Sequence, residues 1–173
     1  LEAVKEVGYT TPTPIQQQSI PVILEGDDLV GCAQTGTGKT AAFAIPIINI
    51  IHKIVGSAKK RKNIRTLVLT PTRELAIQIA ENFDKYAHYT SIKTLAIFGG
   101  VNQVPQVDAL KYGVDVLIAT PGRFLDLYKQ NHINIDHLHQ LVLDEADLML
   151  DMGFINDVRK IIKLTPDNRQ TLL

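Results

Sequence analysis

The stretch "AQTGTGKT" at 33–40 combines glycines with a lysine and a threonine in a spacing that suits phosphate binding. It follows a short apolar run and precedes a segment of helical spacing, so backbone N–H groups and a helix start would face the phosphates. Lys39 could reach the β and γ phosphates, and the Thr40 hydroxyl could coordinate Mg²⁺. The stretch therefore predicts a site for a nucleoside triphosphate and magnesium.

Two other interpretations of this glycine-rich stretch are open. The letters G-T-G-K-T-A also fit a dinucleotide fingerprint, but the second strand would then end in an acidic residue, and here it ends in "LTPT". A purely structural turn is the other alternative. Ala33 replaces the first glycine of the phosphate-loop pattern, although the later glycines are present. The residues predicted to bind the nucleotide are Ala33, Gln34, Thr35, Gly36, Thr37, Gly38, Lys39 and Thr40.

A cluster of carboxylates interrupts the apolar run "LVLDEADLML" at 141–150. Burying unpaired carboxylates costs several kcal/mol apiece, so some group must compensate them, and the predicted phosphate loop suggests a bound cation. Asp144, at the end of a buried strand, is predicted to reach the Mg²⁺ beside Thr40, and Glu145 to orient or deprotonate the attacking water. With Lys39 they form the predicted catalytic set. Asp147 is predicted to take a hydrogen bond or ion pair from a neighbouring loop, as a residue of interdomain coupling. An acidic helix start is the structural alternative.

Short β-rich runs alternate with segments of helical spacing along the chain. Strands are expected within 28–33, 65–70, 92–98, 115–120 and 139–144, and helices at 74–89 and 154–164. This alternation predicts an α/β fold, a parallel sheet flanked by helices on both faces. Ligands of such sheets bind at the carboxyl ends of the strands, which is where both clusters lie.

Composition limits the classes of function. The 173 residues contain 18 Lys plus Arg and 18 Asp plus Glu, with a pI near 7.1, so any binding of nucleic acid must be local. The lone Cys32, expected to lie buried behind the phosphate loop, fits a reducing, cytoplasmic compartment. The longest apolar stretch, 41–55, is too short and too broken to span a membrane. The stretch "GSAKKRKNIR" at 56–65 is predicted to be a solvated loop, with a nuclear signal or a nucleic-acid patch at its "KKRK", 59–62, as the alternatives. His137 and His139 are not expected to bind metal.

Several motifs, in a fixed order, identify a resemblance: "GYTTPTPIQ", "AQTGTGKT", "PTREL", "GG", "TPGR" and "DEAD". Over nearly its whole length the sequence resembles the first RecA-like domain of DEAD-box ATP-dependent RNA helicases, the bacterial members most of all. The resemblance implies a RecA-like fold, ATP and Mg²⁺ as cofactors, and ATP hydrolysis coupled to unwinding of RNA. It implies that 1–173 is the N-terminal domain, incomplete at both ends, of a protein with a second RecA-like domain, and monomeric on its own.

The resemblance also assigns roles to residues outside the two clusters. Gln16 would contact adenine, because an amide offers one donor and one acceptor, and so would select ATP over GTP. The family's aromatic stacking residue, 17 positions earlier, would precede Leu1. The loops after three strands would contact phosphates and 2'-hydroxyls of RNA, largely through backbone N–H groups. The residues predicted to bind RNA are Pro71, Arg73, Gly99, Gly100, Thr120, Gly122 and Arg123.

Each of these motifs also has a purely structural interpretation, and two other functions are alternatives to the helicase. "GYTTPTPIQ" could be a proline-rich turn before a helix, "PTREL" a helix start capped by Thr72, and "TPGR" a helix-opening turn. A DNA translocase of the same superfamily would more often carry His at the position of Asp147. A noncatalytic RNA-binding or scaffolding module could keep the nucleotide site as a switch. Intact Lys39, Asp144 and Glu145 favour the enzyme.

Overall fold

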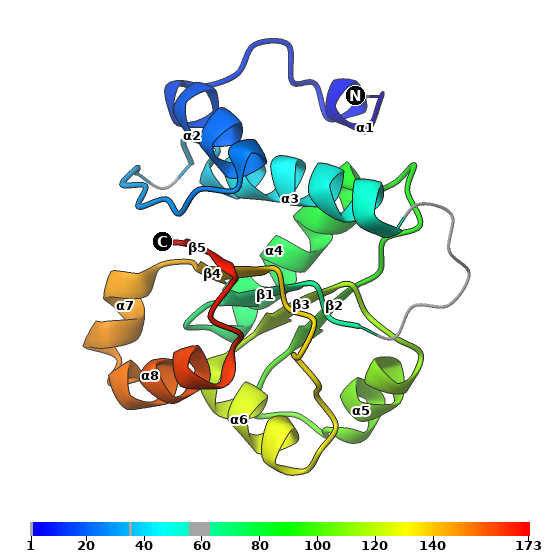
Figure 1. The fold of residues 1–173 in the computed structure, drawn as a ribbon, viewed down its shortest axis with the longest axis vertical. Coiled ribbons are helices and arrows are strands. Elements are labelled where there is room, and N and C mark those ends of the chain that lie inside the picture. Colours follow the sequence, from blue (N-terminus) through cyan, green and yellow to red (C-terminus); the bar gives the residue numbers. More distant parts are fainter. Residues whose placement is uncertain (1, 35, 56–62) are drawn as a thin grey trace.

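Parallel strands form the centre of the protein, with helices above and below them (Figure 1). The computed structural model describes residues 2–34, 36–55 and 63–173. Within these residues the sheet has five strands in the order β2-β3-β1-β4-β5, and all neighbouring pairs are parallel. Parallel neighbours require crossover connections, and helices supply them. The predicted fold, a parallel sheet with helices on both faces, is confirmed.

The strands are short and the helices that connect them are longer. The strands are β1 (Thr66–Leu69), β2 (Thr94–Ile97), β3 (Val116–Ala119), β4 (Gln140–Leu143) and β5 (Gln170–Leu172). The helices are α1 (Glu2–Glu6), α2 (Pro14–Glu25), α3 (Lys39–Val55), α4 (Arg73–Tyr86), α5 (Val104–Lys111), α6 (Pro121–Lys129), α7 (Ala146–Asp151) and α8 (Ile155–Leu164).

Two apolar cores lie on opposite faces of the sheet. Val68 of β1 belongs to the core beneath α2, α3 and α4, whereas its neighbours Leu67 and Leu69 belong to the core with α6 and α8. This division follows from the alternation of side chains along a strand. Phe83 of α4 and Phe124 of α6, both fully buried, anchor the two layers. Strands that are apolar on both faces are typical of a parallel sheet.

The prediction of a first strand at 28–33 is wrong. Leu29 forms only an isolated bridge with Leu172, and the N–H of Gly31 donates to the carbonyl of Leu173 at 2.7 Å. The N–H of Leu29 also donates to the carbonyl of Thr171, and that of Leu173 to the carbonyl of Leu29, so this segment runs beside β5 without forming a strand of its own. Val30 is 80% exposed. The predicted burial of Cys32 is wrong, since this residue is exposed.

The other predicted elements are present within a few residues. The remaining four predicted strands each contain one of β1 to β4, and the helices predicted at 74–89 and 154–164 correspond to α4 and α8. The predicted basic loop at 59–62 lies outside the described residues. Every helix in the described part of the chain is too short or too polar to cross a lipid bilayer.

Candidate functional site: the carboxyl edge of the sheet

The phosphate-loop segment enters α3 through two glycines with left-handed backbone. Gly36 has φ 81° and Gly38 has φ 89°, which only glycine adopts without strain. At Gly38 a Cβ would also lie 2.5 Å from Nε2 of Gln16. Lys39 and Thr40 open α3 directly afterwards. The predicted arrangement of a glycine loop before a helix start is therefore present, although Thr35 lies outside the described residues.

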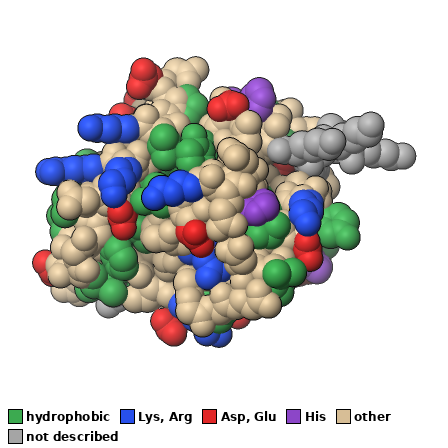
Figure 2. Space-filling model, turned by 90° about the horizontal axis from the view of Figure 1, so that it is seen from below, with side chains coloured by type: hydrophobic (Ala, Val, Ile, Leu, Met, Phe, Trp, Pro, Cys, Tyr) green, Lys and Arg blue, Asp and Glu red, His purple; other side chains and the backbone are tan. Residues whose placement is uncertain are grey.

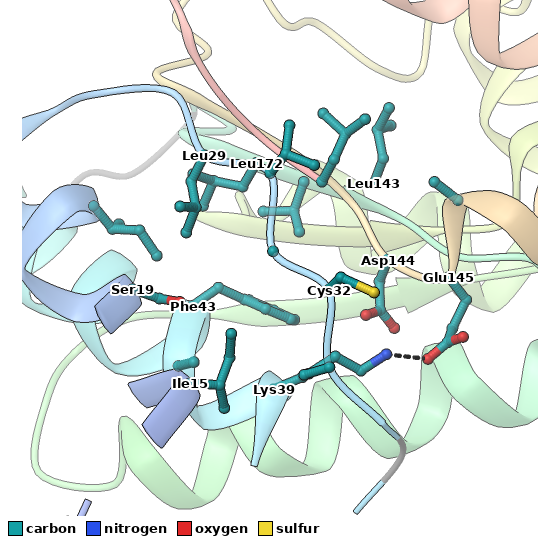
Figure 3. A pocket seen from close by; sticks show the side chains of 18 of the residues that line it. Ile15, Ser19, Leu29, Cys32, Lys39, Phe43, Leu143, Asp144, Glu145 and Leu172 are labelled. Carbon is teal, nitrogen blue, oxygen red and sulfur yellow. Dashed lines mark hydrogen bonds and ion pairs between the residues drawn. The ribbon is translucent and has the colours of Figure 1, made fainter. Parts of the chain in front are cut away.

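The acidic motif lies across from this loop, at the end of β4. The N–H of Asp144 donates to the carbonyl of Leu69 at 2.9 Å, which continues the pairing of β4 with β1. Glu145 has φ 53° and ψ 49°, a left-handed conformation that costs a non-glycine residue about 1–3 kcal/mol. The turn directs its carboxylate to Lys39, whose Nζ lies 2.7 Å from Oε1 of Glu145 (Figure 3). Strain of this kind clusters at functional sites.

The charges of this pair and its neighbours shift one another's protonation. Burial raises the pKa of Asp144 to about 6, the charge of Glu145 adds to the rise, and Lys39 partly opposes it. Burial alone would lower the pKa of Lys39, but its hydrogen bond to Glu145 and the charges of Asp144 and Asp147 raise it. Asp144 is thus a carboxylate that lacks enough positive charge nearby, which is the condition in which a cation binds.

A cavity of about 390 Å³ opens between α2, α3, the segment 29–33 that leads into the phosphate loop, and the acidic motif. Ile15, Phe43 and Leu172 form apolar walls, and Lys39 and Asp144 lie at its polar side (Figure 3). Its size and its mixed lining suit a small molecule with a polar end. Gln16 is not among the residues that line it.

Gln16 is buried, and protein groups occupy both ends of its amide. Its Oε1 accepts from the N–H of Thr13 at 3.0 Å, and its Nε2 donates to the carbonyl of Gly38 at 3.3 Å. The amide therefore joins the segment before α2 to the phosphate loop. The predicted contact with adenine would require these partners to be exchanged, and it stays a prediction.

The "PTREL" loop follows β1 and begins α4. Thr72 caps the helix, since its side-chain oxygen accepts from the N–H of Leu75 at 3.3 Å, so the structural interpretation of this motif is confirmed. Pro71 is buried. The guanidinium of Arg73, exposed at the helix start, lies 5.1 Å from the ring centroid of Phe98. This places it against the segment that leads into Gly99.

The "GG" and "TPGR" loops are joined by an arginine. Nη2 of Arg123 donates to the carbonyl of Val101 at 2.9 Å, and Nε lies 3.9 Å from Oδ2 of Asp126. Nη1 is buried and has no hydrogen-bond partner among the described residues, although the side chain is 10% exposed. The open groove beside it is lined by Gly99, Thr120, Gly122, Arg123, Asp126 and Phe154. A buried donor without a partner is costly, so a turn of this guanidinium that brings Nη1 to an acceptor in the groove would be favourable.

Backbone hydrogen bonds connect these loops in the order of the sheet. The N–H of Thr120 donates to the carbonyl of Ile97, that of Thr70 to Ala119, and that of Asp144 to Leu69, at 3.1, 3.1 and 2.9 Å. Each of these three residues is thereby held by the last carbonyl of a neighbouring strand. The sheet pairing thus extends one residue beyond β1, β3 and β4.

The structure brings most predicted site residues to this one edge, in two groups. Lys39, Asp144 and Glu145 meet at the phosphate loop, and the residues of "PTREL", "GG" and "TPGR" meet around the Arg123 groove. Asp147 is exposed and accepts only from the adjacent N–H of Leu148 among the hydrogen bonds described. No cluster of three or more His, Cys, Asp or Glu suited to a metal was found in the described residues.

Two contacts at this edge were missed by the sequence reasoning. Gln106 of α5 is hydrogen-bonded to the backbone of Phe98, and nothing in its spacing indicates this. The contact between Gln16 and the N–H of Thr13 is half of a capping box, for which the spacing Thr-x-x-Gln is a known signal.

Comparisons with known proteins agree with this arrangement. The profile of the family described as "DEAD/DEAH box helicase" matches residues 13–173. The chain is 46% identical over 173 residues to "ATP-dependent RNA helicase CshA" of Limosilactobacillus reuteri, covering all of this chain and 34% of that protein. It is 47% identical over 172 residues to "DEAD-box ATP-dependent RNA helicase 20" of Arabidopsis thaliana, covering 99% and 34%.

A solved structure shows the same fold. The crystal structure of a DEAD box protein from Methanococcus jannaschii superposes with a TM-score of 0.88 at 38% identity, covering 99% of this chain and 46% of that one. The chain spans about a third of the length of the curated relatives named above. The match of the family profile from residue 13 to residue 173, together with the shared RecA-like fold, shows that the chain belongs to the DEAD/DEAH box helicase family.

Proposed function

We propose that this chain is the N-terminal RecA-like domain of an ATP-dependent RNA helicase, and that it provides half of the site for ATP hydrolysis and half of an RNA groove. The observation that carries the proposal is the contact of Lys39 with Glu145 at 2.7 Å, next to the partly buried Asp144. A phosphate-loop lysine and two strand-end carboxylates at one sheet edge are the parts that phosphoryl transfer needs.

For the nucleotide, we propose that the residues of the phosphate loop hold the phosphates through their N–H groups and that Lys39 neutralises them. Thr40 and Asp144 would hold Mg²⁺, and the raised pKa of Asp144 fits a carboxylate that a cation stabilises. Magnesium, when bound, neutralises charge on the phosphates. The absence of a protein metal cage among the described residues fits an ion that takes its other ligands from phosphate and water.

Glu145 would act on the attacking water once Lys39 turns to the phosphates. In the present structure the two side chains neutralise each other. Binding of the nucleotide would draw Lys39 away and leave the carboxylate of Glu145 free to orient the water or accept its proton. The exchange of one partner for another thus prepares the general base.

For RNA, we propose that the groove beside Arg123 and the starts of α4 and α6 contact the phosphate backbone of a single strand. Support comes from the unpartnered Nη1 of Arg123 and from the helix starts at this edge. The chain has no formal net charge, and acidic and basic side chains are interspersed on the face that Figure 2 shows, so net charge is not expected to attract RNA. Such contacts carry no base sequence information.

We also propose that a second RecA-like domain of the same protein, to which Asp147 couples, completes both sites, and that the protein works in the cytoplasm. The alternative of a noncatalytic scaffold is disfavoured because Lys39, Asp144 and Glu145, which hydrolysis would need, are all present at one edge of the sheet. The test is steady-state ATP hydrolysis by the full-length protein with and without single-stranded RNA, compared with residues 1–173 alone. RNA-stimulated turnover by the full-length protein only is expected. Equal turnover by the isolated domain would contradict a site shared between domains.

A further inference from the structure

The segment that follows the edge strand β2 is held by a side chain rather than by another strand. The N–H of Phe98 donates to Oε1 of Gln106 at 3.2 Å, and Nε2 of Gln106 donates to the carbonyl of Phe98 at 3.2 Å. Gln106 comes from α5 and is 8% exposed. One amide thus satisfies both backbone groups of one residue, as a neighbouring strand would. Of the side chains of this length, only an amide can accept and donate in this way at neutral pH.

Packing does not hold the two glycines that come next. A Cβ built at Gly99 or at Gly100 would meet no atom within 4 Å, and Gly100 has φ 78°. Glycines in open space have many accessible conformations, so the loop must be fixed from its ends. At one end Gln106 fixes Phe98. At the other end Arg123 donates to the carbonyl of Val101.

The same short segment contacts both of the other proposed RNA loops. The ring of Phe98 lies beneath the guanidinium of Arg73, at 5.1 Å from its centroid. The carbonyl of Ile97 accepts from the N–H of Thr120. Movement of Phe98 would therefore change the position of Arg73 and of the "GG" loop together.

We infer that Gln106 is a positioning residue for RNA binding: it locks Phe98, and through Phe98 it sets the Gly99–Gly100 loop and the guanidinium of Arg73 against the RNA strand. Gln106 is buried and would not touch RNA. The inference rests on the proposed function, because it concerns the same RNA groove.

The test uses Gln106→Leu in the full-length protein, which keeps the size of the side chain and removes both hydrogen bonds. The dissociation constants of a fluorescein-labelled single-stranded oligo(U) and of a fluorescent ATP analogue are measured separately. RNA affinity should fall about tenfold, since a loop that must be ordered on binding weakens it. Affinity for the nucleotide without RNA should stay unchanged. Hydrogen exchange at the amides of Phe98 and Gly99 should accelerate, while that at Val68 of the central strand should not.

Gln103→Leu is the matched control, because Gln103 precedes the same helix but is hydrogen-bonded to Gln130 instead. It should bind RNA like the wild type. Gln106→Glu is the second variant, in case the leucine prevents folding: it keeps the acceptor for Phe98 N–H, loses the donor, and should also weaken RNA binding. Wild-type RNA affinity in both Gln106 variants, or an equal loss of RNA and nucleotide affinity, would overturn the inference alone. Failure of the wild type to bind RNA would overturn the proposed function as well.

Discussion

The two halves of the carboxyl edge of the sheet differ in how their polar groups are satisfied. At the phosphate loop, protein partners already occupy the groups proposed to bind ligand: Lys39 pairs with Glu145, and both ends of the Gln16 amide are hydrogen-bonded. At the RNA groove, Arg123 keeps a buried Nη1 without a partner among the described residues. The nucleotide half must exchange contacts to bind, whereas the RNA half has a donor with no described partner to give up.

This difference predicts different energetics for the two ligands. A contact that replaces an internal one contributes only the difference between the two, while a contact to an unpaired buried donor also removes an existing penalty. The affinity for nucleotide should therefore depend on the few side chains that interact more strongly with the charged phosphates than with their partners inside the protein. Binding of RNA should depend on how firmly its loops are held.

The largest effect is expected from Lys39→Ala in the full-length protein. Loss of the cation that faces the phosphates should lower ATP turnover by about 100-fold or more. Circular dichroism should show the fold retained, because Lys39 is at the mouth of the cavity and only its contact to Glu145 is lost. Lys53→Ala, an exposed change on the same helix, is the control and should leave turnover unaltered. Unimpaired hydrolysis by the Lys39 variant would disprove the phosphate-loop assignment.

A smaller effect is expected from Arg123→Ala on RNA affinity. A charge-assisted contact of a mostly buried guanidinium should be worth about 1–2 kcal/mol, so the dissociation constant for single-stranded RNA should rise about tenfold. The loss should be the same for oligo(U) and oligo(A), because a phosphate contact does not distinguish bases. Lys129→Ala at the exposed end of the same helix should change it little. A loss confined to one of the two sequences would contradict a backbone contact.

The sequence predicted which residues lie at this edge of the sheet better than it predicted the contacts that hold their loops in position. Periodicity placed four of the strands, and since carboxyl ends of parallel strands meet at one edge, it also brought "PTREL", "TPGR" and the acidic motif together. These are consequences of local pattern and of sheet geometry. The residues around Lys39, Asp144 and Glu145 were accordingly foreseeable.

The failures have a common physical cause, which is that they depend on how elements are placed in space rather than on a local sequence pattern. The run at 28–33 has strand composition, but whether it forms a ladder depends on its pairing with β5, more than a hundred residues away. The bond from Gln106 to Phe98 depends on the angle at which α5 leaves the loop, and composition does not encode that angle.

The third prediction concerns the uncompensated charge of Asp144 in the nucleotide-free protein. Its pKa is raised from 3.8 to about 6, so the folded protein holds this proton more tightly than the unfolded chain does. The free energy of unfolding should therefore fall as pH rises from about 4 to about 6. Asp144→Asn should remove this dependence and raise stability at pH 7 by about 1–2 kcal/mol, after allowance for solvent screening, while abolishing turnover.

Thermal unfolding of wild type and Asp144→Asn across this pH range measures the effect. Asp157→Asn is the control, since this carboxylate of α8 is paired with Lys160 at the surface and lies away from the site. If the Asp144→Asn variant were less stable than the wild type at pH 7, the charge of this carboxylate would already be compensated in the nucleotide-free protein. The contrast between the two halves of the edge would then be wrong.

The smallest effect is expected from Gln16→Leu, although Gln16 is buried and proposed to read the adenine base. To reach adenine, the amide must release the N–H of Thr13 and the carbonyl of Gly38, so new hydrogen bonds replace old ones and the net gain is small. Affinity for ATP should therefore fall only about three- to fivefold, and the preference for ATP over GTP should shrink by a similar factor. RNA affinity without nucleotide should not change, because the contacts of Gln16 lie in the nucleotide half.

Gln18→Leu, an exposed change on the same helix, serves as the control. The affinities of the wild type and both variants for ATP and GTP are measured by competition with a fluorescent ATP analogue. A loss of a hundredfold or more in the Gln16 variant would mean that the amide gains far more from the nucleotide than it gives up. In that case the exchange of contacts would cost the nucleotide half little, and the proposed difference from the RNA half would be wrong.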